Sequence, residues 1–161
     1  MLSEQEATNA WERMVEAEVR SLYFGDLAAA AVQRKQLIGG STLFLSSGAA
    51  VSVFVSYTLV AGVMSILVAL MSAYSIAVGL DKKASNLANL HSEWNVLADT
   101  YRDIWSNWHS ERARFDYADA VRSEQKLSRA STEATYDEER LKKWTSVVFA
   151  RYQQEPSVQI T

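Results

Sequence analysis

Residues that could carry acid–base or metal chemistry are few in this chain. The two histidines are His91 and His109, and there is no cysteine, which excludes a thiol nucleophile, a disulfide and a thiolate metal site. Each histidine follows an apolar residue of a helical pattern, where a flanking polar side chain is ordinary. Asp99 and Asp103 lie four residues apart, a spacing typical of one solvated helix face.

No sequence motif adds a reactive group to this short list. The chain contains no Gly-rich phosphate loop, no Gly-x-Ser-x-Gly turn and no His-Glu-x-x-His pattern. We therefore predict that the protein is not an enzyme and that it has no catalytic residue, no metal site and no bound cofactor. With 161 residues and a net charge of -3, it is also not a basic protein of the kind that coats nucleic acid.

A long uncharged stretch occupies the middle of the sequence. No Asp, Glu, Lys, Arg or His occurs from Gln36 to Leu80. As one helix this stretch would measure about 67 Å at 1.5 Å per residue, whereas one membrane crossing needs about 20 apolar residues. The stretch therefore predicts two spans, at about residues 37–55 and 59–80, separated near Tyr57, whose ring suits the membrane interface.

The alternative to a membrane hairpin is a buried core hairpin of a soluble protein. It fits less well, because the rest of the chain is too small to cover two apolar helices. Basic residues flank both ends of the uncharged stretch and none lies in its middle, which predicts that both termini are cytoplasmic. These membrane-flanking basic residues are Arg34, Lys35, Lys82 and Lys83.

Small residues recur on one face of each predicted span. They are Gly48, Ser52 and Ser56 in the first span, and Ser65, Ala69 and Ala73 in the second. Such a face lets membrane helices approach closely, so we predict that it packs helices together or lines a narrow pore. A pore of this kind would have no ring of charged side chains and would be weakly selective, or gated by apolar side chains.

The sequence on either side of the spans contains almost no helix breakers and predicts long helices. The first segment, residues 1–36, starts with a capping box formed by Ser3 and Glu6. Residues 81–155 form a second helical region, with a heptad pattern in a helix from about Ala84 to Phe115. Its seam residues are Leu90, Trp94, Leu97, Tyr101, Ile104 and Trp108. Residues 156–161 are predicted to be a loose tail.

Together these patterns predict an all-α protein, in which a two-span transmembrane hairpin continues into a cytoplasmic helical or coiled-coil bundle. We expect the cytoplasmic seam and the small-residue faces of the spans to hold copies of the chain together as a homo-oligomer that is embedded in the lipid bilayer. Packing inside a single chain is the alternative explanation of the seam. No nucleic-acid partner is expected.

The layout resembles the SLATT family of bacterial two-transmembrane proteins. The residues that carry the likeness are Tyr23-Phe24-Gly25-Asp26-Leu27-Ala28-Ala29 and Gln33-Arg34 before the first span, and Leu90, Trp94, Leu97, Tyr101 and Trp105 after the second. The resemblance implies an inner-membrane effector of a prokaryotic antiphage or conflict system. Such an effector would form a pore or disrupt the membrane when a sensor protein or a nucleotide second messenger triggers it.

Two other functions remain open from the sequence. The chain could be a non-conducting membrane anchor or scaffold that recruits soluble partners. It could also be a ligand-sensing subunit that binds a small molecule through its cytoplasmic helices. The anchor predicts no toxicity on overproduction, and the sensor predicts measurable ligand binding.

Overall fold

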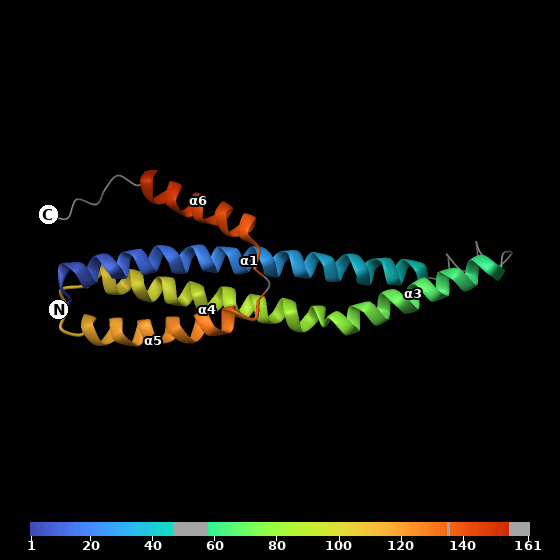
Figure 1. Cartoon of the computed structure of the whole chain (residues 1–161), viewed down its shortest axis with the longest axis horizontal. Coiled ribbons are helices and arrows are strands. Elements are labelled where there is room, and N and C mark those ends of the chain that lie inside the picture. Colours follow the sequence, from blue (N-terminus) through green and yellow to red (C-terminus); the bar gives the residue numbers. More distant parts are fainter. Residues whose placement is uncertain (47–57, 135, 155–161) are drawn as a thin grey trace. The chain divides into compact units, whose positions relative to one another are not determined.

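The computed structural model describes residues 1–46, 58–134 and 136–154, and every regular element in them is an α-helix (Figure 1). The all-α prediction is therefore confirmed. The helices are α1 (Glu4–Ser46), α3 (Thr58–Val78), α4 (Leu80–Ser106), α5 (Ala113–Ser131) and α6 (Glu138–Gln154). They form two compact units: Met1–Asp26 with Leu87–Thr161, here called the helical module, and Leu27–Asn86, here called the apolar unit.

The start of α1 is capped as its sequence predicts. The Ser3 amide donates a 2.8 Å hydrogen bond to Glu6 Oε2, and the Glu6 amide donates to Ser3 Oγ at 3.3 Å. These two bonds satisfy donors that have no partner inside the helix. The Leu2 amide in turn donates to the Trp108 carbonyl at 3.0 Å, so the start of the chain is tied to the residues that follow α4.

The core of the helical module lies between α1 and α4. Trp94, Tyr101 and Ser21 are among its largest fully buried side chains. The two helices approach closely at Gly25, where an added Cβ atom would lie 3.1 Å from His91 Nδ1. Ser21 meets the same histidine, with its carbonyl oxygen 2.8 Å from Nδ1. His91 is therefore part of the packing between α1 and α4.

Helix α5 corrects one sequence prediction. The helix expected to continue to Phe115 ends at Ser106, and α5 begins at Ala113, with the Ala113 amide donating to Ser110 Oγ at 3.1 Å. The chain reverses here, and α5 returns along α4 (Figure 1). This reversal buries three α5 residues at intervals of seven, Ala113, Ala120 and Leu127. Phe115 is 75% exposed and takes no part in the seam.

Helix α6 packs against α1 with little apolar burial. Val148 is its fully buried apolar side chain. Asp137 precedes the helix and caps it, because its Oδ1 atom accepts a 3.1 Å hydrogen bond from the Arg140 amide. The attachment of α6 therefore depends on polar contacts, which are described below.

The apolar unit leaves most of its large apolar side chains exposed. In α3, Ile66 is 62% exposed, Leu70 60% and Ile76 81%. Gly79 separates α3 from α4 with a φ of +58°, a conformation that favours glycine over residues with a Cβ atom. The second span is predicted at residues 59–80, and the helix that corresponds to it, α3, ends at Val78.

Among the described residues, one helical stretch, beginning at Ser65, is long and apolar enough to cross a membrane. Only 6% of its most apolar 18-residue window is buried, whereas the core helix of a soluble protein would be mostly buried. The first predicted span, residues 37–55, enters the described structure only through residues 37–46, at the end of α1. The second crossing of the hairpin therefore stays a prediction.

Candidate functional site

Five of the six residues of the predicted oligomer seam are buried inside one chain. Leu90, Trp94, Leu97, Tyr101 and Ile104 are all buried in the helical module. Trp108 lies beyond the end of α4, is half-buried, and stacks on His109 with ring centroids 3.6 Å apart. Packing within the chain explains this burial without a second copy. That these residues hold an oligomer together stays a prediction.

The small residues predicted to pack the spans together or to line a pore fall into two groups. Ser65, Ala69 and Ala73 are exposed on α3, whereas Gly48, Ser52 and Ser56 lie outside the described residues. The four membrane-flanking basic residues Arg34, Lys35, Lys82 and Lys83 are all exposed. Lys35 Nζ lies 2.5 Å from Asp81 Oδ1, and an ion pair this exposed contributes little to stability.

A cleft of about 870 Å³ lies in the helical module between α1, α5 and α6. Its volume falls within the usual range of ligand sites, about 300–1,000 Å³. Helix α1 supplies the floor, the end of α5 and the residues after it supply one wall, and α6 supplies the other. The lining residues are Trp11, Glu12, Val15, Glu16, Val19, Arg20, Tyr23, Phe24, Ser128, Ser131, Thr132, Ala134, Tyr136, Leu141, Thr145 and Phe149.

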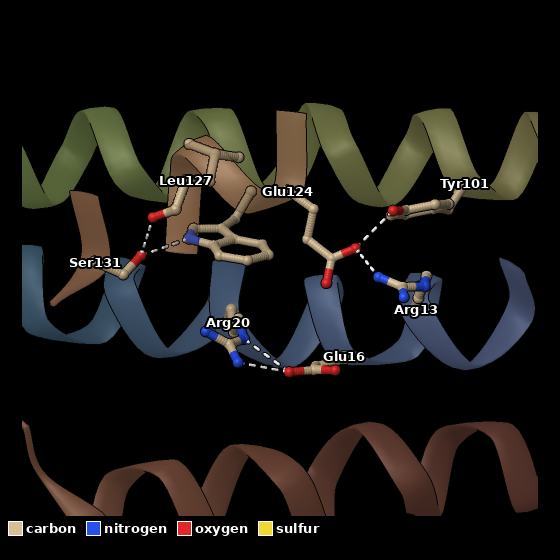
Figure 2. Close-up of polar contacts among 8 residues, drawn as sticks. Arg13, Glu16, Arg20, Tyr101, Glu124, Leu127 and Ser131 are labelled. Carbon is tan, nitrogen blue, oxygen red and sulfur yellow. Dashed lines mark hydrogen bonds and ion pairs between the residues drawn. The ribbon is translucent and has the colours of Figure 1, made fainter. Parts of the chain in front are cut away.

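The charged groups on the cleft floor are Glu12, Glu16 and Arg20. Arg20 donates to Glu16 Oε1 through Nη2 at 2.6 Å and through Nε at 3.1 Å, as Figure 2 shows. Its guanidinium carbon also lies 4.9 Å from the centre of the Trp94 ring, a favourable cation–π arrangement. Arg20 is thus held in place by the module, and its charge is balanced by Glu16.

Glu124 joins three helices behind the cleft. From α5 it accepts a 2.6 Å hydrogen bond from the Tyr101 hydroxyl of α4 and a 2.5 Å bond from Arg13 Nη1 of α1 (Figure 2). Trp94 Nε1 donates to Ser131 Oγ of α5 at 3.1 Å. These contacts fix α5, and hence one wall of the cleft, against α1 and α4.

The opposite wall, α6, is fixed to α1 by acidic groups near both of its ends. Glu18 is 9% exposed, accepts a 2.6 Å hydrogen bond from the Tyr152 hydroxyl and pairs with Arg151. Asp26 accepts a 3.2 Å hydrogen bond from Trp144 Nε1 and lies 3.4 Å from Arg140 Nη1. The position of α6 therefore depends on two carboxylates of α1.

The pKa values of Tyr101 and Tyr152 predict that the helical module loses stability at alkaline pH. Burial, and then the hydrogen bond to Glu124, raise the pKa of Tyr101 well above its ordinary value of 10.0. Burial and the hydrogen bond to Glu18 likewise raise the pKa of Tyr152. Because folding raises both pKa values, the stability that these groups contribute is full below pH 10 and is lost as the pH rises above that value.

We therefore expect a phenolate absorbance step that coincides with loss of helix in circular dichroism, at a pH above about 10. The double variant Tyr101→Phe/Tyr152→Phe should lack that coupled step. The prediction is wrong if all tyrosines of the wild-type chain ionise while the helix content stays constant.

The two aspartates singled out from the sequence, Asp99 and Asp103, do not meet at a common site. Asp99 pairs with Arg102 on the exposed face of α4, with Oδ1 2.6 Å from Nη1. Asp103 lines a separate hollow of about 720 Å³ between α4 and α5. Among residues 1–46, 58–134 and 136–154, no group of three or more His, Cys, Asp or Glu side chains is placed to hold a metal ion.

The cleft was not apparent from the sequence. The interval of seven between Ala113, Ala120 and Leu127 marks a buried face on α5, but these residues line the hollow between α4 and α5 and not the cleft. The α6 wall of the cleft depends on which helix α6 packs against, and no local pattern encodes that choice. No protein-family model, curated protein or solved structure matches the chain, so the SLATT resemblance rests on the residues quoted for it above.

Proposed function

We propose that this chain is a two-span inner-membrane effector of a prokaryotic conflict system, and that it assembles with copies of itself and permeabilises the membrane. The observation that carries the proposal is the exposed apolar surface of α3, where Ile66, Leu70 and Ile76 are each more than half exposed. Such a surface is unfavourable in water and favourable in lipid. The SLATT resemblance supplies the defence role.

In this proposal, copies of the chain contact one another through their membrane spans. Ser65, Ala69 and Ala73 lie four residues apart on α3 and are exposed, so they are available for close contact with another membrane helix. The first span, residues 37–55, would provide the second crossing and keep both termini in the cytoplasm. The seam residues of α4 serve the helical module itself, because they are already buried there.

The helical module would act as the control element. Helix α6 is held by carboxylates rather than by a large apolar face, so a modest change in these contacts shifts its equilibrium between attached and detached positions. A trigger, either a separate sensor protein or a small molecule, would act through this equilibrium. The spans would then change their packing.

The test is induced expression in a bacterium, with growth and membrane potential followed by a voltage-sensitive dye. We expect depolarisation by the wild-type chain and its loss in Ala69→Leu and Ser52→Leu, because a larger side chain blocks close helix contact. Val63→Leu is the matched control: Val63 is 54% exposed on α3 and does not belong to the small-residue face.

Two outcomes contradict this function. A normal potential at confirmed expression in the membrane fraction, with and without phage, would favour the non-conducting anchor. Equal depolarisation by Ala69→Leu, Ser52→Leu and wild type would show that the small-residue face does not form the pathway.

A further inference from the structure

We propose that the cleft between α1, α5 and α6 binds a lipophilic organic cation, that is, an apolar or aromatic body with a delocalised positive charge. The site lies wholly within the helical module, so it does not depend on the membrane activity proposed above. The volume of the cleft, its apolar lining, its hydrogen-bonding groups and its charge each restrict the class of ligand that it can bind.

The lining is apolar and aromatic. Val15, Val19 and Phe24 form a buried floor. Tyr136 and Phe149 also line the cleft, yet they remain 70% and 47% exposed. A ligand that covers these two rings would remove apolar surface from water, which is the main source of affinity in sites of this kind.

Three hydroxyl groups of the walls already donate hydrogen bonds within the chain. Ser131 Oγ donates to the Leu127 carbonyl at 2.8 Å, and Thr132 Oγ1 donates to the Arg129 carbonyl at 2.7 Å. On α6, Thr145 Oγ1 donates to the Leu141 carbonyl at 2.8 Å. Because their protons are engaged with nearby carbonyl groups, these three hydroxyls are poor donors to a sugar or a phosphate, which leaves Ser128 and Tyr136 as the other hydroxyl groups of the walls. The lining therefore favours a ligand that needs few hydrogen bonds.

The charge of the lining favours a cation. Glu12 and Glu16 outnumber Arg20, and the lining contains no lysine. Arg20 already donates twice to Glu16 and covers the Trp94 ring, so it is a poor anchor for an anion. Glu12 is exposed, and its carboxylate has no hydrogen-bond or ion-pair partner in the part of the chain that the structure describes. It can therefore attract a positive charge to the cleft.

The aromatic rings reinforce that preference. A cation within about 6 Å of an aromatic face is attracted by the ring quadrupole, and the attraction grows when water is excluded. Trp11, Tyr136 and Phe149 offer such rings along the cleft. A delocalised cation also loses less hydration on burial than a compact ammonium group does. The net negative charge, the exposed rings and the three engaged hydroxyls of the lining all favour the same ligand class.

The test compares two probes of the same shape and opposite charge, tetraphenylphosphonium and tetraphenylborate. The full chain in phosphatidylcholine nanodiscs is titrated with each probe by calorimetry, and empty nanodiscs correct for partition into lipid. We expect one saturable site per chain for the phosphonium, with an affinity about tenfold or more above that for the borate.

Two variants with matched controls locate the site. Phe149→Ala should weaken phosphonium binding about fivefold, whereas Phe115→Ala, which removes an exposed ring of α5 outside the cleft, should not. Glu12→Gln should also weaken it about fivefold, whereas Glu4→Gln, which removes an exposed carboxylate of α1 outside the cleft, should not.

Three results would overturn the proposal. Equal binding of borate and phosphonium would refute the charge argument. Equal affinities in Phe149→Ala and Phe115→Ala would place the probe elsewhere. Absence of saturable binding would also refute it, and efficient disulfide crosslinking of the Phe149→Cys variant, in a chain that otherwise has no cysteine, would then identify a second copy of the chain as the occupant.

Discussion

Replacing Trp94 with alanine is expected to lower the free energy of unfolding of the helical module by about 3–5 kcal/mol. The Trp94 side chain is 1% exposed, donates to Ser131 of α5 and lies beneath Arg20 of α1. The variant therefore leaves a cavity where three helices meet. Urea unfolding of the full chain in detergent, followed by near-ultraviolet circular dichroism, measures the loss.

Trp105→Ala is the control for this experiment. Trp105 is on the same helix but is only half-buried, so we expect a smaller loss, about 1 kcal/mol. An equal effect of the two variants would show that Trp94 is not the centre of the core. If Trp94→Ala unfolds at the wild-type urea concentration but abolishes self-association, the seam contacts a second copy instead.

The second large effect is expected at Glu18. Replacing Glu18 with alanine removes the acceptor of Tyr152 and the partner of Arg151, and should cost about 2 kcal/mol, as expected for charged hydrogen bonds that are partly buried. The loss should be greatest at α6, because these short contacts attach the end of α6 to α1, whereas Arg102 of α4 lies farther from Glu18, at 3.7 Å. We therefore expect faster trypsin cleavage after Arg140, Lys142 and Lys143, and faster amide hydrogen exchange throughout α6.

The matched control is Glu139→Ala, which removes an exposed carboxylate from α6 itself. It should leave both cleavage and exchange unchanged. Protection of α6 in Glu18→Ala equal to that in wild type would mean that Asp26 and Val148 are enough to hold the helix. An equal increase of amide hydrogen exchange in α1, α4 and α6 would instead show that Glu18 stabilises the whole core.

Several features of the fold could be predicted because they depend on residues close together in the chain. The capping box at Ser3 and Glu6 spans one helical turn, and the structure forms it. The heptad spacing of Leu90, Trp94 and Leu97 places these residues on one face of a helix, and that face is buried. The uncharged composition around α3 likewise indicates a helix whose side chains are not covered by the rest of the chain.

Other features depend on pairs of residues that are distant in sequence. Arg13 meets Glu124, and Glu18 meets Arg151, across more than 100 positions. No local pattern selects these partners, because each charged side chain reads in sequence as part of a solvated helix face. The cleft follows from the same distant contacts, since its two walls are positioned by different acidic residues.

The seam residues show most clearly which features follow from the sequence and which follow from the tertiary structure. Its periodicity alone determined that Trp94 and Tyr101 lie on a buried apolar face, because a helix places every third or fourth residue on one side. Only the tertiary structure decided what covers that face. The chain reverses between Ser106 and Ala113, and this brings α5 onto α4 and closes the core with residues of the same chain.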